Sequence, residues 1–156
     1  MPAKAEAIAA QITNVLTAQA GSIGLAAVYR DRTDAFTREE SPVALVEISE
    51  EDSAPLGSSG RGGFGVDIDV LRLQVIYCVR TPSGWQTTLD GIRTRAHAAL
   101  VQDATLQTLC GGAGAANSFR RDRAQWAGAT TDVPLGTLAQ TYTCKYHTPN
   151  QALDAS

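Results

Sequence analysis

Residues 66–80 (VDIDVLRLQVIYCVR) constrain the fold more than any other stretch of this chain. Their side chains alternate in character, and a period of two residues is typical of a β-strand. One face is uniformly apolar and consists of Leu71, Leu73, Val75, Tyr77 and Val79. The other face is mixed and carries Ile68, Val70, Arg72, Gln74, Ile76, Cys78 and Arg80. The pattern predicts a long strand with one face buried in a core and a second face only half suited to burial.

Two amphipathic segments predict the helices that cover the apolar face. Residues 3–20 place four apolar side chains on one helical stripe, and Gly21 is expected to end this helix. A second stripe runs along residues 86–101 and consists of Leu89, Ile92, Ala96, Ala99 and Leu100. Thr87 and Asp90 resemble a capping box at the start of this second helix.

Shorter apolar runs predict the remaining strands, which are expected at 25–29, 42–49, 117–126 and 137–147. Two polar stretches are predicted to be loops, namely 30–41 and 50–65. The second is rich in glycine and serine, and loops of its length are generally functional or disordered. The expected order is α-β-β-β-α-β-β. We therefore predict an α+β fold: a mixed, largely antiparallel sheet of about five strands with two helices packed on one face.

Length and composition favour one folded domain. We expect it to span residues 1–148 and to be followed by a flexible tail at 149–156. Hydrophobic residues make up 44% and charged residues 19% of the chain, a balance that excludes disorder throughout. No apolar run reaches the roughly 18 residues that a membrane span needs, and the first residues do not resemble a secretory signal. We expect a cytoplasmic protein that does not contact membranes.

The charged residues are unevenly distributed. Residues 31–69 hold ten acidic residues against three arginines, whereas residues 70–123 hold seven arginines against three acidic residues. The net charge of -3 argues against a general nucleic-acid binder, since such proteins tend to be basic. The asymmetry has two interpretations. Both parts are solvated surface, or the acidic part of one copy meets the basic part of the next in a head-to-tail contact.

Cysteine and histidine positions predict no metal site. Cys78, Cys110 and Cys144 have no C-x-x-C spacing, and we expect them to be small buried residues in a reducing compartment. His97 and His147 have no other ligand type at metal-binding spacing.

Other motifs also fail as catalytic or cofactor sites. Residues 60–65 (GRGGFG) match G-x-G-x-x-G, but a strand follows instead of the helix that a dinucleotide site requires. The acidic residues at 39–40 and 50–52 lie in polar stretches with no apolar pocket to raise a pKa. We therefore predict no catalytic residue, no cofactor and no metal.

The arginines at 120, 121 and 123 have two interpretations. They meet phosphate, or they lie on a solvated or salt-bridged edge strand. Strand alternation would place Arg121 and Arg123 on one face and Arg120 on the other. Trp85 and Trp126 are expected at the edge of the core, although tryptophan is also an interface anchor.

The order and spacing of these segments resemble the tail terminator (tail completion, minor tail protein U-like) family of long-tailed bacteriophages over roughly residues 5–148. The resemblance begins with the first amphipathic helix and continues with VYRDRTDAFTREESPVALVEISEED as strand, arginine-bearing loop and strand. It includes VDIDVLRLQVIYCVR as the long central strand and LDGIRTRAHAALVQDATL as helix and turn. A closing strand ends in YTCKYHT.

This resemblance implies a non-enzymatic structural protein of the virion, assembled in the host cytoplasm. In that family, a hexameric ring caps the head-proximal end of the tail tube, ends its polymerisation and joins it to the neck. The implied partners are further copies of the chain, the tail tube protein and a neck or head-completion protein, with DNA only as cargo passing through the ring. The candidate contact residues are Arg30, Arg32, Arg38, Glu50, Glu51, Asp52, Arg61, Phe64, Arg120, Arg121 and Arg123.

Two alternatives remain open at this stage. The chain could be another neck component, such as a head-closure or stopper protein. It could also be a small cytosolic ligand-binding protein or enzyme, whose site would lie on the open face of the sheet.

Overall fold

A computed structural model describes residues 4–30, 40–55, 66–81, 83–111, 118–129 and 135–149. These residues form a five-stranded sheet in the order β1-β2-β3-β5-β4. The strands are β1 (Ala27–Arg30), β2 (Val43–Pro55), β3 (Val66–Arg80), β4 (Arg120–Ala129) and β5 (Leu135–Pro149). The helices are α1 (Lys4–Ala18), α2 (Ala20–Ile23), α3 (Trp85–Gln102) and α4 (Ala104–Leu109).

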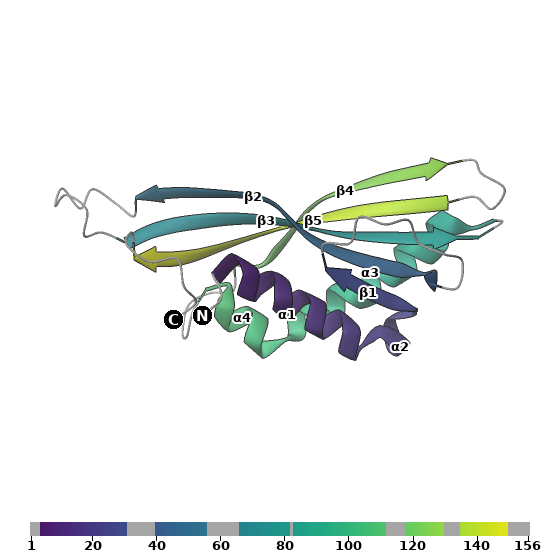
Figure 1. Ribbon diagram of the computed structural model, residues 1–156, viewed down its shortest axis with the longest axis horizontal. Helices are drawn as coiled ribbons and strands as arrows, with labels where there is room; N and C mark the ends of the chain where they lie inside the picture. Colours follow the sequence, from purple (N-terminus) through teal and green to yellow (C-terminus); the bar gives the residue numbers. More distant parts are fainter. Residues whose placement is uncertain are drawn as a thin grey trace.

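The predicted fold class and element order are confirmed. Only the pairing of β1 with β2 is parallel among the described strands, and the other neighbours run antiparallel. Helices α1 and α3 pack against one face of the sheet, as the two predicted amphipathic helices should (Figure 1). The strongly twisted sheet extends past the helix layer at the end where β2 finishes and β3 begins (Figure 1).

The centre of the sheet is β3, which pairs with β2 on one side and with β5 on the other. Its predicted inward face is buried beneath the helices, so this prediction is correct. Tyr77 and Tyr142 are the largest fully buried side chains, and they join the apolar stripes of α1 and α3 in one cluster. Burial of this shared apolar surface is the main source of stability for such a layer of helices on a sheet.

The opposite face of the sheet has an apolar centre and a polar periphery. Val43 and Leu45 of β2 stand next to Cys78 and Ile76 of β3, and Val43 is only 1% exposed. Towards the end beyond the helix layer, the same face carries Arg72 instead. The expectation of a mixed second face therefore holds for these positions.

The helix ends differ from the predictions in two places. Gly21 lies inside α2, and the chain leaves the helix at Gly24, whose φ of 98° is readily adopted only by glycine. No capping bond forms at Thr87 and Asp90, because both lie within α3, whose N-cap residue is Gly84. A side-chain cap does occur at α4, where Asp103 accepts a hydrogen bond from the Leu106 N–H at 2.8 Å.

β2 and β5 are longer than predicted, whereas β1 and β4 are shifted towards the C-terminus relative to their predicted bounds. β2 continues through Pro55, so the first six residues of the predicted loop 50–65 are strand, and 56–65 lie outside the described residues. Arg30, predicted to open the loop 30–41, is the last residue of β1. β5 reaches Pro149, although the sequence predicts that the flexible tail begins there; residues 150–156 lie outside the described part. Pairing with β3 explains both extensions, because its full length offers hydrogen-bonding partners on each side.

A β-bulge breaks the alternation that was predicted for the arginines of β4. Arg121 pairs with Tyr142 and Ala124 pairs with Gln140, so two residues, 122 and 123, stand opposite Thr141 alone. The prediction that Arg121 and Arg123 share one face of the sheet is therefore wrong, because the bulge interrupts the simple alternation on which it rests. The buried Gln140 side chain stabilises the bulge by donating to the Arg123 and Thr141 carbonyls, both at 3.1 Å.

Trp85 lies in the first turn of α3, and its ring packs against a glycine of β4 and a glycine of β5. A methyl group at Gly136 would overlap the Trp85 ring, and one at Gly128 would lie 3.0 Å from its Cζ2. The ring centroid of Trp85 is 6.3 Å from that of Trp126. Glycine is required at Gly136 because the indole occupies the space of a Cβ.

We expect Gly136→Ala to destabilise the fold by about 1–3 kcal/mol, because the indole must shift to admit the methyl group. Gly21→Ala is the matched control, since nothing lies within 4 Å of its added Cβ; we expect no loss or a gain of up to ~1 kcal/mol. Urea unfolding followed by tryptophan fluorescence measures both. Equal stability of G136A and the unmodified chain would contradict the packing described here.

Candidate functional site

The candidate contact residues that the structure describes do not form one cluster. Arg120, Arg121 and Arg123 lie on β4, whereas Glu50, Glu51 and Asp52 lie on β2, at the opposite side of the strand order. Arg32, Arg38, Arg61 and Phe64 lie outside the described residues. The structure therefore presents two separate charged regions, which we call the β2 edge (residues 47–55) and the β4 edge (residues 120–128).

The β4 edge is the more exposed of the two. Every residue from 120 to 128 is exposed except the half-buried Ala124. β4 pairs with β5 on one side, and no described strand pairs with its other side. Its backbone N–H and C=O groups on that side are consequently available to another chain.

An aromatic side chain lies on the same strand as the arginines of the β4 edge. Trp126 is 39% exposed, whereas the other large hydrophobic side chains among the described residues are buried or half-buried. The guanidinium of Arg93 on α3 lies 5.4 Å from the Trp126 ring centroid, within the range of a cation–π contact. The β4 edge thus combines three cations with an aromatic surface, a composition that is enriched at protein interfaces.

The β2 edge is acidic. β1 covers β2 only along Val43–Val46, and no described strand pairs with the same side of β2 beyond that point. A bulge at Ser49 reverses the alternation, so that Glu50 and Asp52 lie next to Arg72 on the helix-free face. Their carboxylates are 3.0 and 3.2 Å from the Arg72 guanidinium. All three side chains are exposed, so these ion pairs contribute little to stability and leave the acids accessible to a partner.

Glu51 and Arg30 have contacts within the chain. The bulge directs Glu51 to the helix side, where its carboxylate accepts a hydrogen bond from the Tyr146 hydroxyl. Arg30 pairs with Glu6 of α1 at 2.9 Å and donates to the Val46 carbonyl at 3.1 Å. Arg30 therefore ties α1 to the sheet, and the structure does not place it on either charged edge.

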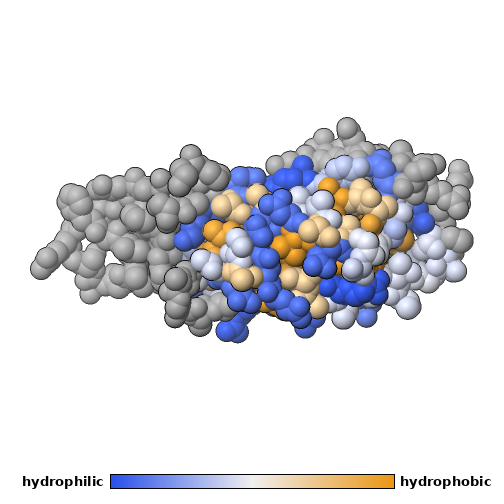
Figure 2. Space-filling model, turned by 90° about the horizontal axis from the view of Figure 1, so that it is seen from below, coloured by the Kyte–Doolittle hydropathy of each residue, from blue (hydrophilic) through white to orange (hydrophobic). Residues whose placement is uncertain are grey.

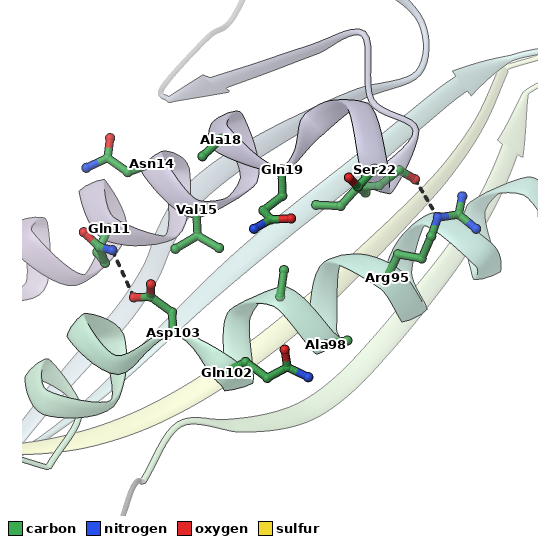
Figure 3. A pocket seen from close by; sticks show the side chains of 12 residues that line it. Gln11, Asn14, Val15, Ala18, Gln19, Ser22, Arg95, Ala98, Gln102 and Asp103 are labelled. Carbon is green, nitrogen blue, oxygen red and sulfur yellow. Dashed lines mark hydrogen bonds between the residues drawn. The ribbon is translucent and has the colours of Figure 1, made fainter.

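A polar groove that the sequence did not predict lies between the helices. It has a volume of about 720 Å³ and runs between α1–α2 and α3 on the outer side of the helix layer (Figure 3). Gln11 donates to Asp103 at 3.0 Å across one end, and the Arg95 Nε–H donates to the Ile23 carbonyl at 2.8 Å across the other. No sequence signal identifies it, because the polar outer faces of two helices do not reveal that the helices lie side by side.

The surface around the groove is mixed in character. In Figure 2, which views the helix layer from outside, small apolar areas are separated by hydrophilic side chains. Glutamine, asparagine and serine dominate the polar lining of the groove, alongside Arg95 and Asp103. The groove lies on the side of the sheet that the helices cover. If the chain were a ligand-binding protein or enzyme, the sequence predicts a site on the opposite, helix-free face.

A second polar cluster lies beneath α3. The His97 Nδ1 is 3.3 Å from the Tyr142 hydroxyl, and the two rings stack with centroids 5.8 Å apart. Burial raises the pKa of Tyr77 and Tyr142 well above the ordinary range. Burial, with the charges of Arg121 and Arg93, lowers the pKa of His97 below its ordinary value of 6.5. At neutral pH these groups are uncharged and serve packing.

The described residues hold no group of three or more histidine, cysteine or acidic side chains that could bind a metal ion. None of the described helices is both long enough and apolar enough to cross a membrane. A scan against models of known protein families matches none of them, and a search of curated proteins likewise finds no relative.

The depressed pKa of His97 predicts a dependence of stability on pH. Below about pH 6.5 the unfolded chain takes up a proton at this position more readily than the folded one, so stability falls as the pH drops, and above that range the contribution is constant. We expect His97→Gln to flatten this part of the profile, measured by urea unfolding from about pH 8 to about pH 5. His147→Gln is the matched control for loss of a histidine. An unchanged slope in H97Q would contradict this assignment.

Proposed function

We propose that this chain is a tail terminator of a long-tailed bacteriophage. In this proposal it forms a hexameric ring at the head-proximal end of the tail tube, ends tube polymerisation and provides the joint to the neck. The observation that carries the proposal is the pair of oppositely charged sheet edges, one acidic on β2 and one basic on β4, which have no partner strand among the described residues. The sequence resemblance to the tail terminator family supports the same conclusion.

The positions of the two edges suit a head-to-tail contact. Because β2 and β4 lie on opposite sides of β3 and β5, a chain that offers its β4 edge to one neighbour keeps its β2 edge for another. Contacts of this kind use two different surfaces and either close into a ring or continue as a filament. Opposite charges favour the correct pairing, since two acidic or two basic edges would repel each other.

The exposed backbone of β4 adds a second source of affinity. Pairing an unsatisfied strand edge with another chain provides main-chain hydrogen bonds, while the side chains determine which strand is accepted. Trp126 would lose its exposed surface in the same contact and act as an apolar anchor. The arginines would then be interface residues and not a phosphate site.

The remaining parts of the proposal concern the partners. We propose a structural role in the virion with no catalytic step and no cofactor, with the tail tube protein and a neck protein bound to the two sides of the ring. DNA passes through the ring only as cargo. The proposed ring is assembled in the host cytoplasm, without contact to membranes.

Charge exchange between the edges tests the proposed contact. Arg120→Glu/Arg123→Glu and Glu50→Lys/Asp52→Lys should each weaken self-association at least about tenfold, because each places like charges in apposition. One variant then has two acidic edges and the other has two basic edges. An equimolar mixture should therefore associate again, because each contact between different variants brings an acidic edge to a basic one. Sedimentation velocity at low and high salt measures the association of each variant and of the mixture.

Thr105→Glu on α4 is the control for added negative charge, since its side chain is exposed on the helix layer. It should leave association unchanged. If both double variants associate as the unmodified chain does at low salt, the two edges are not the contact and the proposal fails.

A further inference from the structure

Two buried cysteines that are far apart in the sequence lie close together at the C-terminal end of α4. Cys110 is the C-cap residue of α4, and Cys144 lies in β5; both are 0% exposed. Both belong to the same apolar core, and the Cys110 thiol lies close enough to Cys144 to raise the pKa of Cys144. Both thiols are free in the structure.

Ser118 holds the two backbone segments together at this point. Its N–H donates to the Cys110 carbonyl at 3.0 Å, and its hydroxyl also contacts that carbonyl. The same hydroxyl accepts from the Lys145 N–H and lies 2.8 Å from the Lys145 carbonyl. A single side chain thus bridges Cys110 to the residue that follows Cys144, which fixes the two cysteines as neighbours.

The third cysteine provides an internal comparison. Cys78 pairs with Val43 and Thr137, on the face of the sheet opposite to Cys144. Cys144 pairs with Leu71, so the two cysteines are also separated by seven residues along β3, or about 23 Å. Cys78 therefore cannot reach either of the other two in the folded chain.

We propose that Cys110 and Cys144 are the site of a reversible disulfide that ties the end of α4 to β5. A thiolate of one cysteine attacks a low-molecular-weight disulfide, which gives a mixed disulfide and releases one thiol. The second cysteine attacks the protein sulfur of that mixed disulfide, forms the Cys110–Cys144 bond and releases the second thiol. Two protein thiols are oxidised, one external disulfide is reduced, and the two protons end on the released thiols.

The environment of the pair controls how readily it reacts. The neighbouring Cys110 thiol and burial together raise the pKa of Cys144, so little thiolate is present at neutral pH while the chain is closed. Access requires opening of the chain around α4, a helix of only six residues. Oxidation should consequently be slow and should accelerate as the pH rises.

The bond would close a loop that contains β4. Because Cys110 precedes β4 and Cys144 lies in its partner strand, the disulfide would limit the separation of β4 from the sheet in partly unfolded states. This inference does not depend on the proposed function, since it concerns the thiols alone.

Peptide mapping of the folded, full-length chain tests the proposal. The chain is incubated with excess glutathione disulfide, alkylated without reduction and digested for mass spectrometry. We expect a peptide cross-linked through Cys110 and Cys144, an alkylated Cys78, and a rise in Tm of roughly 5–15 °C that dithiothreitol reverses.

The variants separate this pair from general thiol oxidation. Cys78→Ser should keep both the cross-link and the rise in Tm, whereas Cys110→Ser and Cys144→Ser should lose both. If a serine variant does not fold, the peptide map of the unmodified chain still shows whether Cys110 and Cys144 are cross-linked. Free thiols after prolonged oxidation at alkaline pH, separate glutathione adducts on both residues, or a cross-link to Cys78 would each overturn the proposal.

Discussion

The structure depends on the burial of one face of β3 under α1 and α3. Leu71, Leu73 and Val75 contribute to a core that also takes the apolar stripes of both helices. Because β3 is the central strand, this burial fixes the positions of β2 and β5, and through them the positions of the edges β1 and β4. The described helices cover only one face of the sheet (Figure 1), so the charged residues on its other face and at its edges are left for solvent or for a partner.

Elements with a regular hydrophobic period could be predicted from the sequence. β3 has the bounds that its alternation indicates, and α3 lies within one residue of its predicted ends. The regular period succeeds here because the burial of a repeated apolar face outweighs local preferences along the whole element. The fold class follows from the order of these elements.

Features that depend on long-range pairing could not be predicted. The residues Glu50, Glu51 and Asp52 are typical of a loop, yet they continue β2 because the first half of β3 offers them hydrogen-bonding partners. The bulges at Ser49 and after Arg121 have no signature in a single sequence, although each of them decides which way neighbouring charges point. The same limit explains why the groove and the Cys110–Cys144 pair were missed, since both arise where separate elements meet.

The two charged edges connect the fold to the proposed role. A sheet with an acidic edge on β2, where β1 no longer covers it, and a basic edge on β4 is suited to repeated association in one direction. The exposed side of β4 would be an aggregation risk in a protein that works alone, whereas in a ring it becomes an interface. The free thiol pair lies beside the start of β4, so its oxidation state bears on the same part of the molecule.

Electron microscopy of tail tubes mixed with the purified chain tests the central claim most directly. The account predicts a six-fold ring at one end of each tube and no further growth of capped tubes when tube protein is added. Tubes that grow to the same length with and without the chain, together with a chain that stays monomeric beside them, would contradict it.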